Sequence, residues 1–292
     1  MTFYLGVDAG GTASKSRLVD QDGRVLGSGK AGPANARIGL DKLHGTLLDV
    51  CFQALREGGV DESLYGTVRV GMGIAGINRM GMKQQLQLLE FPFAHVQLTS
   101  DSMIANLGAH RGADGAILII GTGSVGLVKR GEDSFSIGGY GFPISDEGSG
   151  AALGLSAIRH ALRALDGRTR PTPLSQAVTQ QFDHAIPKVI AWMDDAAPGD
   201  YASFAPLVMD YAETGDEIAL SIVRDAAQHV ERFIETILAK GATRCVLMGG
   251  LAERIKPWLR ARIVEKLDEP LGDALDGALL FAGLPIATAA RG

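Results

Sequence analysis

The chain has 292 residues, and 28 Lys and Arg against 33 Asp and Glu give a formal net charge of −5 at pH 7. The basic residues are scattered singly or in short pairs, which does not fit the concentrated basic surface of a nucleic-acid-binding protein, so no nucleic-acid partner is expected. With 46% hydrophobic and 21% charged residues, the composition is that of a globular protein with one large or two medium domains.

The apolar segments are short. Stretches such as Ala116–Ile120 are five residues long, whereas a membrane-spanning helix needs ~20. The N-terminus lacks the basic segment and apolar core of a signal peptide. We therefore expect a cytoplasmic protein with no membrane partner. Cys51 and Cys245 form no Cys-x-x-Cys pair, and the histidines show no metal-ligand spacing, which predicts buried or free thiols and no zinc site.

The first hundred residues predict the order βββαβαβ. Apolar and alternating patterns, separated by Gly10-Gly11 and by Gln21-Asp22-Gly23, favour an initial strand-turn-strand unit. Leucines and valines at helical spacing favour the first helix. The predicted elements are strands over 3–7, 14–20 and 24–29, a helix over 41–56, a strand over 67–77, a helix over 81–89, a strand over 95–101 and a helix over 102–109.

From Asp114 the pattern restarts, because 115–130 again reads as strand, glycine turn and strand. We interpret this as an internal repeat. The later predicted elements are helices over 151–165, 215–240 and 276–282, a strand, turn and helix over 243–255, and a turn-rich segment over 166–206 with a helix near 186–193. The helix over 276–282 is expected to pack back on the first half. No flexible linker is evident, which favours two α/β lobes that share a cleft.

Two glycine turns at equivalent points of the repeat are candidates for phosphate binding. Gly10, Gly11 and Thr12 follow the first strand, and GTGS at 121–124 follows the strand that opens the second half. Glycines let consecutive backbone N–H groups point at phosphate oxygens, and a carboxylate such as Asp8 can hold Mg²⁺ through its waters. For the first turn alone, an ordinary hairpin is the alternative. No Walker A sequence is present.

Other loop residues carry weaker signals. Gly249-Gly250 fits either backbone access for a nucleoside or a tight strand-to-helix connection. Asp101, at the end of the strand HVQLTSD, is a candidate general base or a helix N-cap. The loop 138–151, with Tyr140, Asp146 and Glu147 among glycines, suits a polyol ligand, or is an ordinary loop with a helix cap at Ser149. Asn35 and the loop 75–78 are further polar residues at strand ends or plain turn formers.

These motifs, in this order, resemble the BadF/BadG/BcrA/BcrD-type ATPases, in particular their N-acetylglucosamine and glucosamine kinase branch. The resemblance rests on DAGGT, the Asp of LTSD, GTGS, GGYG followed by SDEGSGA, and LMGGLAERI, and covers nearly the whole chain. It implies an α/β, two-lobe actin-like (ribonuclease H-like) fold with duplicated mixed β-sheet domains and a central nucleotide cleft. The implied lobes are 1–110, completed by a C-terminal helix in 275–292, and 111–274.

The resemblance also assigns roles. It implies that Asp101 takes the proton of the sugar hydroxyl and that Asp8 is the magnesium-side carboxylate. The implied ATP contacts are Gly10, Gly11, Thr12, Gly121, Thr122, Gly123, Gly249 and Gly250. The implied sugar contacts are Asn35, Gly76, Asp101, Ser124, Val125, Tyr140, Gly141, Phe142 and Asp146. Tyr140 stands where sugar kinases of the family often have tryptophan, and the zinc-binding cluster of the ROK sugar kinases is missing.

The leading hypothesis is a homodimeric, ATP- and Mg²⁺-dependent kinase that phosphorylates the 6-hydroxyl of glucosamine or N-acetylglucosamine. The first alternative is an ATPase that activates a radical dehydratase or reductase, which shares the fold but holds an iron-sulfur cluster through cysteines. The second is a sugar-sensing regulator or actin-like assembly protein. A DNA-binding regulator should have a basic helix-turn-helix segment, and the sequence shows none.

Overall fold

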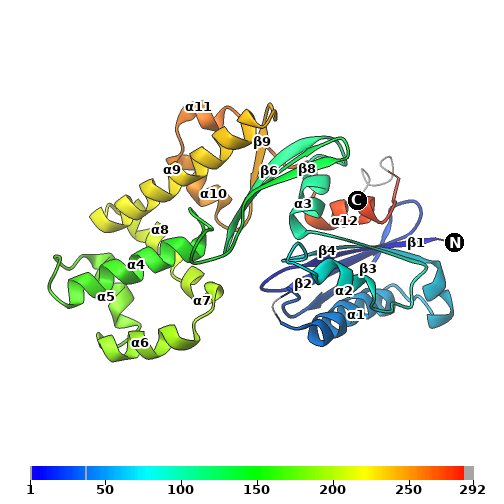
Figure 1. The fold of residues 1–292 in the computed structure, drawn as a ribbon, viewed down its shortest axis with the longest axis horizontal. Coiled ribbons are helices and arrows are strands. Elements are labelled where there is room, and N and C mark those ends of the chain that lie inside the picture. Colours follow the sequence, from blue (N-terminus) through cyan, green and yellow to red (C-terminus); the bar gives the residue numbers. More distant parts are fainter. Residues whose placement is uncertain (1, 37, 286–292) are drawn as a thin grey trace. The chain divides into compact units, whose positions relative to one another are not determined.

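The computed structural model describes residues 2–36 and 38–285, which form two compact units (Figure 1). Unit 1 contains the residues up to Gly115, Lys129–Gly131, and the residues from Glu269 on. Unit 2 contains Ala116–Val128 and Glu132–Asp268. The lobe boundaries expected from the sequence, near 110 and 275, lie a few residues from these division points. Residues 286–292 of the predicted C-terminal segment lie outside the described residues.

In the described part of unit 1, a five-stranded mixed sheet has the order β3-β2-β1-β4-β5. Its strands are β1 (Phe3–Ala9), β2 (Ser14–Val19), β3 (Val25–Ala31), β4 (Val68–Ile74) and β5 (His95–Thr99). Strands β1, β4 and β5 are parallel to one another, whereas β2 is antiparallel to both β1 and β3. The carboxyl ends of the three parallel strands therefore meet at one edge of the sheet. The predicted order βββαβαβ is confirmed.

Helices cover both faces of this sheet. They are α1 (Leu40–Glu57), a 3₁₀ turn (Glu62–Thr67), α2 (Met82–Gln87), α3 (Asp101–Ala109) and α12 (Ala274–Phe281). On one face, the Ser16 hydroxyl donates to the Val50 carbonyl of α1 at 2.7 Å. On the other face, glycines let α3 and α12 approach the strands closely. A Cβ at Gly71 would lie 2.2 Å from the Ala278 carbonyl oxygen. The C-terminal helix thus packs back on the first half, as predicted.

In the described part of unit 2, a five-stranded sheet has the order β10-β9-β6-β7-β8. Its strands are β6 (Gly115–Ile120), β7 (Ser124–Arg130), β8 (Asp133–Gly138), β9 (Cys245–Met248) and β10 (Leu267–Asp268). β9 is parallel to both β6 and β10. The sequence pattern predicted β6, β7 and β9 but missed β8 and β10, because β8 is mostly exposed and β10 has only two residues.

The helices of unit 2 form its main hydrophobic core with the sheet. They are α4 (Gly150–Leu165), α5 (Pro173–Gln180), α6 (Ile186–Asp195), α7 (Pro198–Ala202), α8 (Ala205–Glu213), α9 (Glu217–Ala239), α10 (Ala252–Ile255) and α11 (Ala261–Val264), with a 3₁₀ turn at Lys256–Trp258. The predicted helix near 186–193 is confirmed as α6, but the prediction of turns for the rest of segment 166–206 is wrong, since α5 and α7 also lie there. Prolines sit in the first turn of α5, α6 and α7, where they are tolerated.

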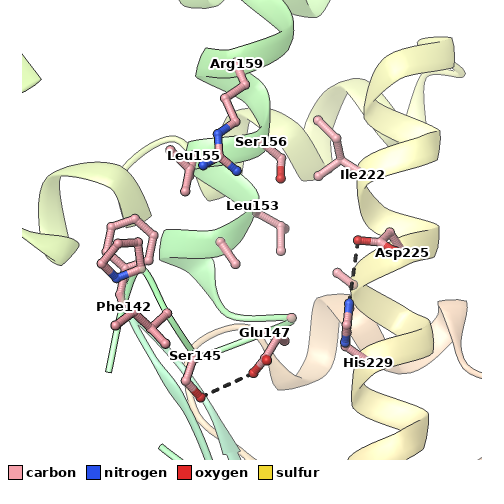
Figure 2. Close-up of a pocket in the computed structure, with 15 residues that line it drawn as sticks. Phe142, Ser145, Glu147, Leu153, Leu155, Ser156, Arg159, Ile222, Asp225 and His229 are labelled. Carbon is pink, nitrogen blue, oxygen red and sulfur yellow. Dashed lines mark hydrogen bonds and ion pairs between the residues drawn. The ribbon is translucent and has the colours of Figure 1, made fainter. Parts of the chain in front are cut away.

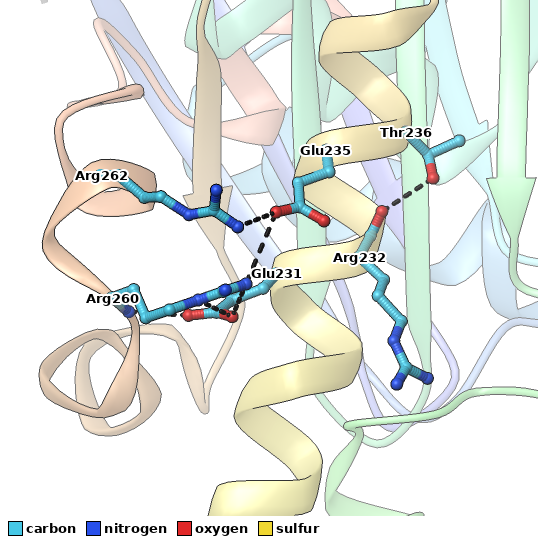
Figure 3. Close-up of polar contacts among 6 residues, drawn as sticks. All are labelled: Glu231, Arg232, Glu235, Thr236, Arg260 and Arg262. Atoms are coloured by element: carbon cyan, nitrogen blue, oxygen red, sulfur yellow. Dashed lines mark hydrogen bonds and ion pairs between the residues drawn. The ribbon is translucent and has the colours of Figure 1, made fainter.

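Helix α9 carries the predicted apolar stripe, which is buried, and an ion-pair network on its other side (Figure 3). The Glu231 carboxylate accepts from the backbone N–H of Arg260 at 2.7 Å and from its Nε at 2.6 Å. Glu235, one turn further on, accepts from Arg262 at 2.8 Å. These contacts attach the segment that contains α11 to helix α9.

Cys51 and Cys245 are both buried free thiols. Within the described residues, no helix has the length and apolar character required to cross a membrane.

Candidate active site

The edge where β1, β4 and β5 end brings together most of the site residues predicted in unit 1. The Ala75 N–H donates to the Ala9 carbonyl at 2.9 Å, which joins the loop after β4 to the end of β1. The Ala34 N–H donates to the Gly10 carbonyl at 3.1 Å, and Asn35 forms an isolated β-bridge with Ala75. The loops that carry Gly10, Asn35 and Gly76 are therefore tied to one another by backbone hydrogen bonds.

Two carboxylates lie at this edge. Asp8 is near the end of β1, and Asp101 lies two residues after the end of β5. The pKa of Asp8 is raised to about 6, mainly by burial and also by the charge of Asp101, while Lys15 acts in the opposite direction. Burial also raises the pKa of Asp101, against the opposing effect of its hydrogen bond with the Ser102 N–H. Each carboxylate is thus a stronger base than an exposed aspartate, and the two are close enough to repel one another.

Asp101 is not the N-cap of helix α3, so that alternative is wrong. The cap is Ser100, whose hydroxyl accepts the Met103 N–H at 3.1 Å. Asp101 is the first residue of the helix, and its carboxylate accepts the adjacent Ser102 N–H at 2.8 Å. The helix begins one residue earlier than predicted. Because a serine satisfies the helix end, the carboxylate has acceptor capacity left for a ligand.

The first glycine turn is closed by its own backbone. Gly10 donates its N–H to the Ala13 carbonyl at 3.1 Å, so this donor is not available to a phosphate group. Gly11 and Thr12 are exposed, and a Cβ at Gly11 would meet no atom within 4 Å. The turn is therefore a hairpin in which Gly11 and Thr12 are exposed.

The second glycine turn, in unit 2, is held between two neighbouring segments. The Gly121 N–H donates to the Gly123 carbonyl at 2.9 Å, and the Gly121 carbonyl accepts from Gly150 at 2.8 Å. Gly150 begins helix α4, which Ser149 caps through the Ala152 N–H, as predicted. The Ser124 hydroxyl donates to the Glu147 carbonyl at 2.8 Å. Residues 121–124 and the loop 138–150 are thus one hydrogen-bonded structure.

Asp146 is the centre of that structure. Its carboxylate accepts the backbone N–H groups of Gly141, Phe142 and Ser124, and its backbone has a left-handed φ of 69°. Burial raises its pKa, while these three N–H groups act in the opposite direction. A Cβ at Gly123 would lie 2.8 Å from the Asp146 carboxylate, so only glycine leaves room for this packing. Three of the predicted sugar contacts, Ser124, Gly141 and Phe142, therefore donate to the buried carboxylate of a fourth, Asp146.

The remaining predicted sugar contacts differ in exposure. Val125 packs against the backbone at Gly139, where a Cβ would lie 2.8 Å from a Val125 methyl. Tyr140 is 81% exposed, so it is available as an aromatic wall but contacts little in unit 2. Phe142 packs against Tyr201, with ring centroids 4.9 Å apart.

A pocket of about 180 Å³ lies beside the loop 138–150, between it and helices α4 and α9 (Figure 2). Phe142, Ser145 and Glu147 line it from the loop, and Arg159 and His229 from the two helices. Asp146 is not among its lining residues, so this pocket is distinct from the Asp146 centre.

Gly249 has a structural role. Its φ is +102°, and a Cβ there would lie 2.3 Å from the Ile120 carbonyl oxygen. The same carbonyl accepts the Leu251 N–H at 3.1 Å. The predicted tight strand-to-helix connection is therefore present, and it places Gly249 at the end of β6, next to Gly121. Gly250 has open space around it.

The carboxylate oxygens at the sheet edge where β1, β4 and β5 end are suitable ligands for magnesium. Mg²⁺ prefers oxygen ligands and is held by one or two carboxylates together with substrate phosphates. Asp8 and Asp101 supply such oxygens, and a divalent cation would offset their mutual repulsion. Within residues 2–36 and 38–285, no group of three or more His, Cys, Asp or Glu side chains could hold a metal by itself.

The spacing of motifs did not single out Lys15. It lies directly opposite Asp8 in the β1–β2 register and is exposed. The alternation along β2 puts Lys15 and Ser16 on opposite faces of the sheet. Which of the two shares a face with Asp8 depends on the strand register, and the sequence pattern does not predict that register.

Comparison with known proteins gives the family. The model of the BadF/BadG/BcrA/BcrD ATPase family matches residues 5–282. The chain belongs to this family. A glucosamine kinase of Vibrio cholerae is 38% identical over 285 residues, which cover 98% of this chain and 97% of that protein.

Solved structures agree with this assignment. A Chromobacterium violaceum protein, suggested to be an N-acetylglucosamine kinase, is 30% identical with a TM-score of 0.91 and covers 97% of this chain and 99% of its own. A ROK hexokinase of Thermus thermophilus has a TM-score of 0.57 at 20% identity, over 96% of this chain and 98% of that one. The second likeness concerns the fold alone. The predicted actin-like ATPase fold is confirmed, and the nucleotide cleft stays a prediction.

Proposed function

We propose that this protein is an ATP-dependent hexosamine kinase that phosphorylates the 6-hydroxyl of glucosamine or N-acetylglucosamine. The observation that carries the proposal is the pair Asp8 and Asp101, two interacting carboxylates of raised pKa at the edge where three parallel strands end. The family is one of ATPases, and the relatives that cover nearly the whole chain are described as kinases of amino sugars. A homodimer in the cytoplasm is proposed with it.

Asp101 acts as the general base. Its carboxylate accepts the proton of the sugar 6-hydroxyl while that oxygen attacks the γ-phosphorus in line, the bond to the bridging oxygen of ADP breaks, and ADP leaves. Burial, which raises the pKa of Asp101, makes it a better proton acceptor than an exposed aspartate. The carboxylate is fixed at the first turn of α3, so its direction does not depend on a flexible loop.

Asp8 would hold the magnesium ion of MgATP, and the ion would neutralise charge on the phosphates. The N–H groups of the exposed residues Gly11 and Thr12, and the second turn at 121–123, are the proposed phosphate donors, with Gly249 and Gly250 on the adenosine side. The proposed sugar contacts besides Asp101 are Asn35 and Gly76 in unit 1 and Ser124, Val125, Tyr140, Gly141, Phe142 and Asp146 in unit 2.

The two cysteines do not favour the alternative, an activator of a radical dehydratase. Such a protein needs accessible thiolates for its iron-sulfur cluster. Cys51 and Cys245 are both fully buried, and burial raises the pKa of each, that of Cys245 to about 12. Neither thiol is suited to bind a cluster.

The test measures ADP release by the purified protein with MgATP and glucosamine, N-acetylglucosamine, glucose or no sugar. We expect ADP release that depends on one of the two amino sugars, and a product phosphorylated at the 6-oxygen by NMR. The ratio between the two amino sugars identifies the preferred 2-substituent. Equal release with and without sugar would contradict the proposal.

A further inference from the structure

The pocket beside the loop 138–150 has a lining that is part apolar and part charged (Figure 2). Its walls come from three elements of unit 2, namely that loop, helix α4 and helix α9. The larger apolar residues in the lining are Phe142, Pro143, Leu153, Leu155 and Ile222. The ionisable residues in the lining are Glu147, Arg159, Asp225 and His229. Such a lining suits a ligand that has both an apolar part and charged groups.

Two of the charges in this pocket have no partner of opposite sign. The Asp225 carboxylate lies 3.8 Å from the His229 Nε2, so these two residues of α9 are partners. The Glu147 carboxylate accepts the Ser145 hydroxyl at 3.4 Å, which is a long hydrogen bond. Within residues 2–36 and 38–285, neither Glu147 nor Arg159 forms an ion pair. The pocket therefore contains one unpaired anion and one unpaired cation.

These two unpaired charges lie apart. In Figure 2, Arg159 enters the pocket from helix α4 at the top of the view, and Glu147 lies on the loop below it. Ser156 also lines the pocket, and residues three apart on a helix share a face, so its hydroxyl is on the side of Arg159. A ligand that satisfies both ends is dipolar, with its negative group toward α4 and its positive group toward the loop.

The lining also selects the kind of anion. A guanidinium group binds carboxylates and phosphates equally readily through its planar fork. A phosphate monoester carries nearly two negative charges, and Glu147 and Asp225 in the same pocket would repel it more strongly than a carboxylate. The positive group that Glu147 attracts is an ammonium. A carboxylate and an ammonium on one small molecule define an amino acid.

The size of the pocket limits the ligand further. Its volume of about 180 Å³ is below the ~300–1,000 Å³ of sites that enclose drug-sized ligands. A nucleotide or a disaccharide is therefore too large, whereas a single amino acid is of suitable size. The apolar lining residues offer a surface for an apolar side chain.

We infer that this pocket binds a free α-amino acid with an apolar side chain. The carboxylate of the ligand contacts Arg159, and its ammonium group contacts Glu147. The inference is independent of the proposed function, because neither contact involves a nucleotide or a sugar. Phe142 lines the pocket and also donates its N–H to Asp146. The amino acid would thus contact the loop that carries four of the proposed sugar contacts, as an effector and not as a substrate.

The experiment measures binding by calorimetry, without nucleotide or sugar. The ligands are L-leucine, isocaproate, which lacks the ammonium group, isoamylamine, which lacks the carboxylate, and glycine, which lacks the apolar side chain. The proteins are the full-length wild type, R159Q, E147Q and R163Q. Arg163 is the matched control because it is an exposed arginine one turn further along α4 and does not line the pocket.

We expect the wild type to bind L-leucine about 10-fold or more tightly than any of the other three ligands, since each of them lacks one group that the pocket contacts. R159Q should weaken leucine and isocaproate about 10-fold and isoamylamine less than about 2-fold. E147Q should weaken leucine and isoamylamine about 10-fold and isocaproate less than about 2-fold. R163Q should leave all four affinities within about 2-fold of the wild type.

The pattern across the ligands is decisive, because all of them bind the same folded population of a given variant. A wild type that does not bind leucine at millimolar concentration overturns the inference. Isocaproate that binds as tightly as leucine would reveal a simple anion site and would also overturn it, as would equal effects of R159Q and R163Q. Sugar-dependent ADP release is a separate assay, and its absence in a protein that shows the expected pattern would remove only the proposed function.

Discussion

Ser100 caps helix α3, and this leaves the carboxylate of the adjacent Asp101 free of the capping role. The Ser100 hydroxyl caps helix α3 through the Met103 N–H at 3.1 Å, and the Asp101 carboxylate accepts the neighbouring Ser102 N–H. An aspartate used as the cap would have its oxygens committed to the helix end. The serine therefore leaves Asp101 at the strand edge with acceptor capacity for a substrate proton.

This division predicts opposite effects of two neighbouring substitutions. S100A removes the cap and should lower the free energy of unfolding by ~0.5–2 kcal/mol while turnover changes little. D101N keeps the shape and the cap but removes the base, so turnover should fall by ~10² or more with the melting temperature preserved. Thermal unfolding and ADP release measured on both variants check this. If turnover falls as much in S100A as in D101N, the effect of D101N comes from the structure of helix α3 and not from the loss of a general base.

Asp8 is predicted to reduce the stability of the metal-free protein at neutral pH. Its pKa rises from 3.8 to about 6 on folding, so the folded state favours the protonated form, and stability is lost as pH rises from 3.8 through 6. D8N avoids this loss and should be more stable than the wild type at pH 7.5, by at most ~3 kcal/mol from 1.36 kcal/mol per pKa unit. The gain should vanish near pH 3.5.

The measurement is chemical denaturation in EDTA at several pH values, with sugar-dependent ADP release assayed in parallel. D8N is expected to lose activity while it gains stability. If the variant is less stable than the wild type at pH 7.5, the Asp8 carboxylate is not under the electrostatic strain inferred from its burial and from Asp101.

Glu231 is predicted to stabilise unit 2 through its contact with Arg260. Burial acts to raise the pKa of Glu231, but the side-chain and backbone hydrogen bonds from Arg260 outweigh it and lower the pKa below 4.5. Its contribution is therefore present above pH 4.5 and is lost as pH falls through the lowered pKa. E231Q should melt at a lower temperature than the wild type at pH 7, and the difference should shrink toward pH 3.

E235Q is the matched control, because Glu235 lies one turn away on α9, also pairs with an arginine, and is 43% exposed where Glu231 is 5% exposed. Exposed pairs contribute little, so its melting temperature should stay near that of the wild type. Equal effects of E231Q and E235Q would show that burial of Glu231 adds nothing.

Two glycine-to-alanine substitutions should change stability in opposite directions. A Cβ at Gly108 of α3 would lie 1.8 Å from the Asp273 carbonyl oxygen, just before α12, so G108A forces the two helices apart and should cost ~1–3 kcal/mol. Gly45 is inside α1, where an added methyl group would meet no atom within 4 Å, and G45A should stabilise by ~0.4–1 kcal/mol. Urea denaturation of both variants tests this, and stabilisation by G108A would refute the close packing.

Much of the architecture follows from local sequence. Hydrophobic spacing determined helices α1 and α9, and the glycine turns between apolar strands determined the hairpin at 10–12, because these signals depend on neighbours along the chain. The same signals failed at β10 and at helices α5 and α7, where prolines resemble loop residues unless one knows that they occupy first turns.

The sequence by itself determined the family, the repeated strand-turn-strand units and the candidacy of Asp8, Asp101 and Asp146. Tertiary structure alone decided what each of them contacts. The repulsion between Asp8 and Asp101, the contact of the Ser124 N–H with Asp146 and the row in register from Asp8 through Lys15 to Lys30 join residues that are distant in sequence or on separate strands. Strand register and loop packing fix such contacts, and neither leaves a periodic signal along the chain.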